Sequence, residues 1–161
     1  MQSLDCESNF PAHSDECAAL VLDTIPLVMG LFKSTMRSLR PAEISVPQFR
    51  TMLYLQRNHG ASLSEVADFL GLTLPSASKL VDGLVKREYV TRVMSEEDRR
   101  RAILTLTAHG TATLQEVRQE AIAQFAQRMA VLSDEERTGI FHAMRTLSRL
   151  CPSGREGEVG K

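Results

Sequence analysis

Apolar side chains cover nearly the whole circumference of a helix predicted over residues 15–39, with Leu20, Leu27 and Leu31 among them. A helix that is hydrophobic on more than one side is normally buried on more than one side. Contact with a second subunit would explain this pattern. Pro26 lies inside the stretch, and it is expected to kink or restart the helix because proline removes a helical hydrogen bond.

Further helices are predicted where a Ser stands three residues before a Glu or Gln, since the two side chains cap each other's backbone N–H groups. Such capping boxes begin at Ser45, Ser62 and Ser133. The first opens a helix that ends near Gly60. The third opens a final helix with one apolar face, formed by Ile140, Phe141, Met144 and Leu147.

The second capping box opens a short helix that Gly71 ends, and Thr73 caps a second helix over residues 74–88. Two helices joined by a tight turn make a helix-turn-helix, whose second helix lies in the major groove with its N-terminal residues at the base edges. Small polar residues suit that task. Ser76 and Ser78 fit close to phosphates or bases, and Lys79 reaches a phosphate or a guanine.

The spacing then changes, and two strands are predicted at Val90–Val93 and Ala102–Leu106, with a charged hairpin tip over residues 94–101. The tip holds three acids followed by three arginines. A narrow minor groove attracts inserted arginine, and Asp98 can hold the guanidinium of Arg100 by a charge-assisted hydrogen bond. The alternative is a solvated turn with local ion pairs. The position directly after a helix-turn-helix favours contact with DNA.

A long helix follows, which Thr107 caps and which runs to about residue 132. The fold class is therefore mainly α with a small β-hairpin wing: a winged helix-turn-helix DNA-binding lobe plus a helical dimerisation region. The expected segments are a flexible N-terminal arm, an N-terminal dimerisation helix region, the DNA-binding lobe, the C-terminal dimerisation helices and a flexible tail. In that order they span residues 1–14, 15–44, 45–106, 107–151 and 152–161.

Composition places the chain among ordinary soluble proteins, with 161 residues, 43% hydrophobic and 24% charged. The net charge of −1 gives no support for a polyanionic partner, but residues 1–32 hold five acids and no Lys or Arg, so the basic residues are concentrated later. No stretch is expected to reach the roughly 18 to 20 apolar residues of a membrane span, and no signal peptide is evident at the N-terminus. We therefore expect a cytoplasmic protein without a membrane partner.

Four motifs together resemble the MarR family of winged-helix regulators, over roughly residues 18–150. The most specific is Asp98-x-Arg100 followed by Leu106-Thr107 and Gly110. The other three are Pro47-Gln48-Phe49, Leu63-Ser64-Glu65-Val66-Ala67 and Ser78-Lys79-Leu80-Val81-Asp82.

The resemblance implies an obligate homodimer whose first and last helices build the interface and whose two lobes bind a pseudo-palindromic operator in double-stranded DNA. It also implies a repressor that a small amphipathic or phenolic effector releases, or in other relatives the oxidation of a cysteine. It places Arg100 at the wing with Asp98 in support. The residues expected to meet DNA are Ser62, Pro75, Ser76, Ser78, Lys79, Lys86, Arg87, Asp98, Arg99, Arg100 and Arg101.

Two positions depart from the family pattern. Relatives usually carry Gly where this chain has Glu88, and a Gly there would relieve a left-handed backbone at the helix end. Gly83 stands where many relatives carry Arg or Lys. The loss of that cation removes one expected phosphate contact and shifts the expected operator affinity toward the wing.

Soft apolar residues of the first two helices could line an effector pocket between the dimerisation helices and the DNA-binding lobe, because flexible side chains adapt to varied ligands. Arg50 and His59 could orient a ligand carboxylate there. The alternative is that the apolar residues are plain core. The full set is Met29, Phe32, Met36, Phe49, Arg50, Met52 and His59.

The three cysteines form neither a disulfide framework nor a metal-binding pattern. Cys17 lies near the start of the first helix, where peroxide-sensing relatives place their reactive thiol, but the neighbouring Asp15 and Glu16 disfavour a thiolate. Cys151 lies between two arginines. A Cys17–Cys151 pair between subunits is one redox hypothesis, and inert thiols are the alternative.

Two other function classes were weighed. An enzyme finds no support, because the chain has no GxSxG motif, no P-loop and no His spacing typical of a metal site, so no cofactor or metal is expected. A winged helix that binds protein instead of DNA is the second alternative. Gly83, Glu88 and the near-neutral charge are compatible with it, whereas three arginines at the hairpin tip argue against it.

Overall fold

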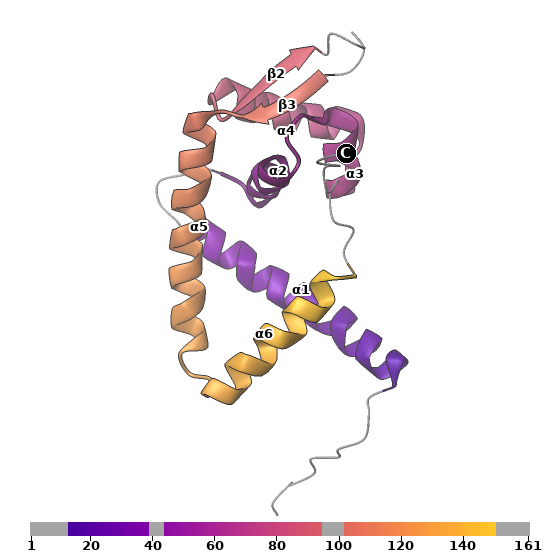
Figure 1. The fold of residues 1–161 in the computed structure, drawn as a ribbon, viewed down its shortest axis with the longest axis vertical. Coiled ribbons are helices and arrows are strands. Elements are labelled where there is room, and N and C mark those ends of the chain that lie inside the picture. Colours follow the sequence, from indigo (N-terminus) through magenta and orange to yellow (C-terminus); the bar gives the residue numbers. More distant parts are fainter. Residues whose placement is uncertain (1–12, 39–43, 95–101, 151–161) are drawn as a thin grey trace, which may run out of the picture. The chain divides into compact units, whose positions relative to one another are not determined.

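The structure, a computed structural model, describes residues 13–38, 44–94 and 102–150, and these form mostly helices with one small sheet (Figure 1). This arrangement confirms the predicted fold class of a mainly helical protein with a β-hairpin wing. In chain order the elements are α1 (Ser14–Ser38), α2 (Val46–Arg57), β1 (Ala61–Ser62), α3 (Leu63–Leu70), α4 (Leu74–Lys86), β2 (Val90–Met94), β3 (Ala102–Leu106), α5 (Ala108–Met129) and α6 (Asp134–Ser148).

The chain divides into two compact units, residues 1–34 and 35–161. The described part of the first unit is helix α1 up to Ser34, which continues through Pro26 without a restart. Apolar side chains along it are exposed, among them Leu20 at 68% and Leu27 at 74%.

Helix α1 is long and apolar enough, by length and composition alone, to cross a membrane, with an 18-residue window of mean hydropathy 1.6. The expectation that no stretch reaches this threshold is therefore wrong. The segment holds few charges between Asp23 and Lys33, and this lifts its mean hydropathy although polar residues interrupt it. Core helices of soluble proteins meet the same criterion.

The second unit begins with the last turn of α1 and contains the sheet and helices α2 to α6. Thr35 and Met36 are buried in it, and the hydroxyl of Ser38 donates a hydrogen bond to Oε1 of Gln124 in α5 at 2.8 Å. Its core is mainly apolar and comes from the sheet and from helices other than α6, which has no buried residue. The largest fully buried apolar side chains are Met52, Leu55, Val66, Val81, Leu84, Val90, Leu104 and Leu114.

All three predicted capping boxes are present. In each, the Ser hydroxyl accepts from the backbone N–H three residues on, and the Gln or Glu side chain accepts from the N–H of the Ser. In the second box, the N–H of Ser62 lies 2.7 Å from Oε2 of Glu65. Each cap is worth about 1 kcal/mol, and the caps explain why these helix starts could be placed from sequence.

The sheet has three antiparallel strands in the order β1-β3-β2, one more than the hairpin predicted from sequence. Leu104 of β3 pairs with Ala61 of β1 on one side and with Arg92 of β2 on the other. The extra strand, β1, has only two residues, which is too few for the alternation of apolar and polar side chains that predicts a strand from sequence. It places the start of α3 against the central strand and so ties the helix-turn-helix to the hairpin.

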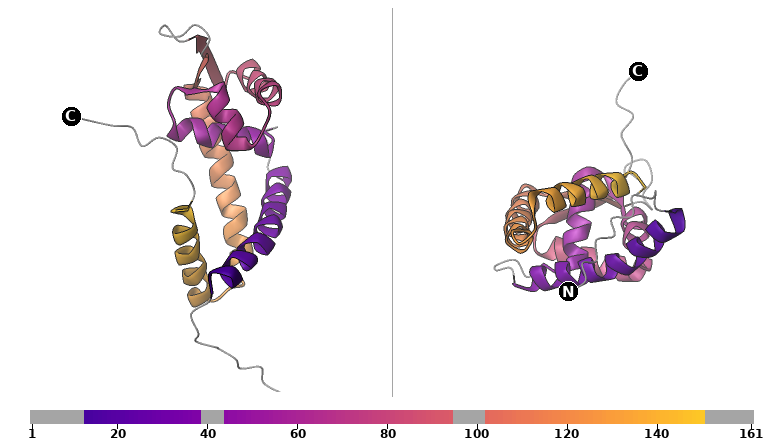
Figure 2. Two further views of the ribbon diagram at one scale, coloured as in Figure 1. Left: turned by 90° about the vertical axis from the view of Figure 1, so that its right-hand side faces the viewer. Right: turned by 90° about the horizontal axis from the view of Figure 1, so that it is seen from below.

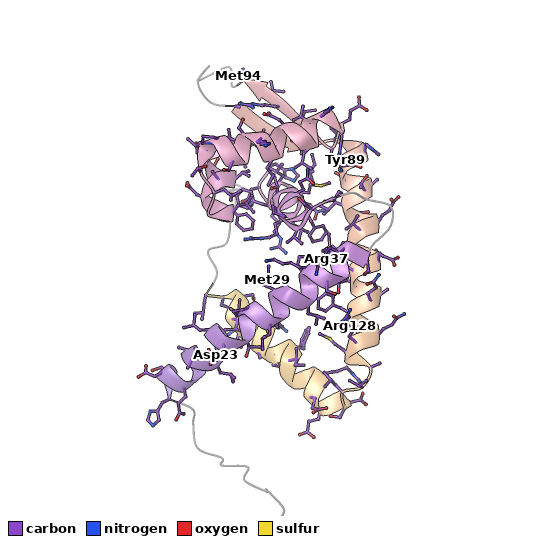
Figure 3. All side chains as sticks on the ribbon, turned by 180° about the vertical axis from the view of Figure 1, so that it is seen from behind. Asp23, Met29, Arg37, Tyr89, Met94 and Arg128 are labelled. Carbon is purple, nitrogen blue, oxygen red and sulfur yellow. The ribbon has the colours of Figure 1, made fainter. Side chains whose placement is uncertain are left out.

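The hairpin is joined to α5 by a close backbone contact around Tyr89 (Figure 3). The N–H of Thr107 donates to the carbonyl oxygen of Tyr89 at 3.0 Å, and the hydroxyl of Thr107, which caps α5, donates to the carbonyl of Glu88 at 2.6 Å. Gly110 lies against the same place, since a Cβ there would be 2.0 Å from the carbonyl oxygen of Tyr89. A side chain at position 110 is therefore excluded.

Candidate nucleic-acid interface

The turn between α3 and α4 is closed by backbone hydrogen bonds. Gly71 has a φ of 68°, its N–H donates to the carbonyl of Asp68, and the N–H of Leu72 donates to the carbonyl of Ala67 at 2.9 Å. This is the pattern of a helix ended by a left-handed glycine, in which the following apolar residue packs on the last turn. It fixes the angle at which α3 holds α4.

Helix α4 is anchored by one side and open on the other. Ala77, Val81 and Leu84 are fully buried and form its apolar face. The exposed side carries mainly polar groups, as a helix laid in the major groove requires. Its exposed residues are Leu74, Pro75, Ser76, Lys79, Asp82 and Lys86.

The start of α4 is held by its cap. The Thr73 hydroxyl accepts from the N–H of Ser76 at 3.4 Å and donates to the Ser76 hydroxyl at 2.9 Å. Ser78, one turn beyond Leu74, is half-buried. The unpaired backbone N–H groups of a first turn favour a phosphate, so this end of the helix suits an anion as well as base edges.

Strand β2 runs back beside α4, and Arg92 on the strand forms an ion pair with Asp82 on the helix, at 3.3 Å between Nη1 and Oδ1. The pair neutralises the one acid among the exposed residues of α4. From the sequence, Arg92 was expected only to lie in a strand, and the pair was not predicted. The antiparallel return of the hairpin along the helix is what brings the two residues together, and neither sequence spacing nor composition reveals it.

The β2–β3 hairpin projects beyond the helices of its unit (Figure 2). Val93 and Met94 at the end of β2 are exposed to 60% and 52%, and Met94 stands where the described strand ends (Figure 3). The predicted wing residues Asp98, Arg99, Arg100 and Arg101 lie outside the described residues. Their roles stay predictions, although the strands that carry them are where the sequence placed them.

The remaining predicted DNA contacts are unequal in exposure. Lys86 is exposed, and Arg87, the C-cap of α4, is half-buried. Ser62 is only 8% exposed, and its hydroxyl is occupied with Glu65 in the capping box. Its contact with DNA stays a prediction, and its observed role is to begin α3.

Both departures from the family pattern have visible local consequences. Glu88 has a φ of 60°, the left-handed region in which side chains other than glycine are strained. Gly83 is half-buried, and a Cβ there would lie 3.2 Å from Nε2 of Gln48. A longer side chain at position 83 would have to move Gln48, which caps α2.

The residues predicted to line an effector pocket fall into both units. Met29 and Phe32 belong to the first, whereas Met36, Phe49, Arg50, Met52 and His59 belong to the second. Phe49 and Met52 are buried in the core of the second unit, at 4% and 0% exposure, and His59 is exposed. The pocket itself stays a prediction, and core packing accounts for Phe49 and Met52.

Helices α2 and α3 share a small aromatic cluster that was not predicted from the sequence. The rings of Tyr54 and Phe69 stack with centroids 4.5 Å apart, and the guanidinium of Arg50 lies 5.3 Å from the centroid of Phe69. Phe69 is nevertheless 44% exposed. The cluster joins α2 to α3 and places Arg50 over a partly exposed aromatic ring.

The redox hypothesis rests on one described residue. Cys17 is exposed and free, in the first turn of α1 beside Asp15 and Glu16. Cys151 lies outside the described residues. Within the part of the chain that the structure describes, no group of three or more His, Cys, Asp or Glu side chains is placed to hold a metal ion.

Comparison with known proteins gives consistent matches. A model of the MarR family matches residues 43–101. The transcriptional repressor MprA of Escherichia coli K12 is 30% identical over 132 residues, which cover 80% of this chain and 75% of the relative.

Solved structures share the fold. The crystal structure of RV1404 from Mycobacterium tuberculosis matches with a TM-score of 0.71 and 22% identity, over 91% of this chain and all of that one. Streptococcus pneumoniae FabT, crystallised in complex with DNA, matches with a TM-score of 0.61 and 21% identity, over 86% of this chain and 96% of that one. At these identities the likeness concerns the fold.

Proposed function

Since this chain belongs to the MarR family, we propose that it is a sequence-specific, double-stranded DNA-binding transcriptional regulator that acts as a homodimeric repressor. Helix α4 would read the major groove, and the hairpin tip over residues 94–101 would enter the minor groove. Two features together support the proposal. Helix α4 is anchored by a buried side and has an exposed, mainly polar side, and the hairpin projects beyond the helices of its unit.

Relatives support the regulatory role. MprA carries the name of a transcriptional repressor, and FabT was crystallised with DNA on the same fold. Proteins of this family are transcriptional regulators and not enzymes. The alternative of a protein-binding winged helix is less well supported, because α4 presents Lys79 and Lys86 and the pairing of Asp82 with Arg92 removes the charge that would repel phosphate.

A homodimer is favoured by apolar surface that one copy leaves exposed. Leu20 and Leu27 on α1, and Phe141 and Met144 on α6, are each more than half exposed, at 68%, 74%, 57% and 53%. Large apolar side chains exposed in such numbers on a helix usually mark an interface. A second copy of the chain that contacts α1 and α6 would cover it.

Release by a small amphipathic or phenolic effector belongs to the same proposal. Arg50 lies over the partly exposed ring of Phe69 and so offers a cation next to an aromatic side chain, which suits an aromatic carboxylate.

Selection from a random duplex library tests the function. The protein should enrich a pseudo-palindrome whose half-sites are centred about 10 base pairs or a multiple of that apart, and Lys79→Ala should bind the enriched duplex more weakly. Failure to enrich any sequence over several rounds, with reduced and oxidised protein alike, would contradict the proposal.

A further inference from the structure

A leucine occupies the end of α4 that the proposed function places nearest to the bases. Leu74 is the first residue of the helix and is 51% exposed. The N-terminal residues of a recognition helix are those that reach base edges. A large apolar side chain exposed at this point is therefore placed to meet a base edge in the proposed complex.

The positions of two other apolar residues around the same turn have an explanation within the chain. Leu72 is 37% exposed and follows the left-handed Gly71, the position at which an apolar residue commonly packs on the preceding helix. Phe69 stacks on Tyr54. Neither arrangement accounts for Leu74.

The polar groups of α4 offer little with which to read purines. The helix contains no Asn or Gln, which read adenine, and no Arg, so Lys is the one residue type in it that can make a bidentate contact with guanine. The Ser76 hydroxyl already accepts a hydrogen bond from Thr73, and Asp82 is paired with Arg92. In the first two turns of α4, Lys79 is then the one long polar side chain that can reach a base.

We propose that Leu74 reads thymine in each half-site of the operator by packing on the 5-methyl group of that base. This methyl group projects into the major groove and distinguishes thymine from the other three bases without any hydrogen bond. Pro75 beside it, also exposed, has no N–H and extends the apolar surface. The inference rests on the proposed function. It specifies thymine as a base that the helix recognises and Leu74 as the residue that recognises it.

The size of the effect follows from the burial of one methyl group. Removal of the methyl should weaken binding about fourfold per half-site, and about 15-fold for a dimer that uses two. The effect should be independent of salt, because no charge is involved.

The probe is the duplex that the protein itself enriches from a random library, prepared once with thymine and once with deoxyuridine, which lacks only the methyl. Binding of both duplexes is measured for the wild type, for Leu74→Ala and for Leu72→Ala. The wild type and Leu72→Ala should prefer the thymine duplex by the stated factor, and Leu74→Ala should bind the two duplexes within about twofold of each other.

The outcomes separate the inference from the function on which it rests. Specific binding by the wild type without a preference for thymine overturns the inference and leaves the regulator intact. Retention of the full preference by Leu74→Ala overturns it as well, since another residue must then contact the methyl. Failure of the wild type to select any duplex removes the proposed function, and the inference with it.

Discussion

Two backbone positions beside Tyr89 decide how the hairpin is joined to its neighbours, and both lie at motifs of the family pattern. Gly110 allows α5 to approach the carbonyl of Tyr89, and Glu88 carries a left-handed backbone. The resemblance indicated both positions in advance. The limited space between Gly83 and Gln48 could not be predicted, because the two residues come close only when α4 packs beside α2.

Replacement of Gly110 by Ala should lower the free energy of unfolding by about 2 to 3 kcal/mol, because the new methyl meets backbone that cannot move aside cheaply. Chemical denaturation followed by circular dichroism measures the change. Gly139→Ala is the matched control, since Gly139 lies in α6 with nothing within 4 Å of its Cβ position. That variant should gain about 0.5 to 1 kcal/mol from helix propensity, and an equal loss in both variants would refute the contact.

Replacement of Glu88 by Gly should raise the free energy of unfolding by about 1 kcal/mol, because glycine adopts a φ of 60° without strain. The measurement is the same denaturation curve. Glu88→Ala removes the charge but keeps the strain, so it should bring no comparable gain. Equal stabilisation by both variants would assign the effect to charge instead of backbone.

The starts of the helices were predictable because caps are local. Ser45, Ser62 and Ser133 each act with a partner three residues away, and Gly71 ends α3 by its own conformation. The pair of Asp82 and Arg92 and the strand β1 were missed for the opposite reason, since each depends on an element that returns from further along the chain.

Replacement of Arg92 by Ala should weaken DNA binding while changing stability by less than about 1 kcal/mol, because the ion pair is exposed. The loss exposes the charge of Asp82 to phosphate. In an anisotropy titration, Asp82→Asn/Arg92→Ala should recover affinity toward the wild type. A double variant as weak as Arg92→Ala would show that Arg92 contacts DNA directly.

The sequence predicts how much each of the three arginines at the hairpin tip, residues 99–101, contributes to DNA binding. Arg100→Ala should reduce DNA affinity at least as much as Arg99→Ala or Arg101→Ala, because Asp98 is expected from the sequence to hold the Arg100 side chain in place. Parallel titrations of the three variants on one selected duplex measure the order. If Arg100→Ala binds like the wild type and Arg101→Ala does not, the register of the wing is wrong.

For the whole molecule, the exposed apolar side chains of α1 and α6 are the main feature that one chain leaves unexplained. The sequence indicated this for α1 through its nearly continuous hydrophobic circumference. The mean hydropathy of α1 is high enough for a membrane span for the same reason, since apolar residues occupy nearly all sides of the helix. A helix that serves a subunit interface needs no polar side.

Removal of residues 1–20, or of the residues after 132, should abolish dimerisation, because each deletion removes part of the proposed interface. Sedimentation equilibrium should give twice the 17.9 kDa of the chain for the full protein.

Phe141→Asp tests the same surface with a single change and should weaken dimerisation. Val93→Asp, on the exposed strand β2, is the control that should remain dimeric. A folded monomer from the full chain would contradict the dimer.

The most direct test of the central claim is the salt dependence of binding to the selected duplex, measured by fluorescence anisotropy with unlabelled random DNA as competitor. The account predicts saturable binding that survives the competitor and weakens about 1,000-fold or more between about 50 and 200 mM salt, as six or more phosphate contacts require. Lys79→Ala should lower the slope by about one. Binding that the competitor abolishes, or that changes less than about tenfold over this range, would mean that the winged helix does not read DNA.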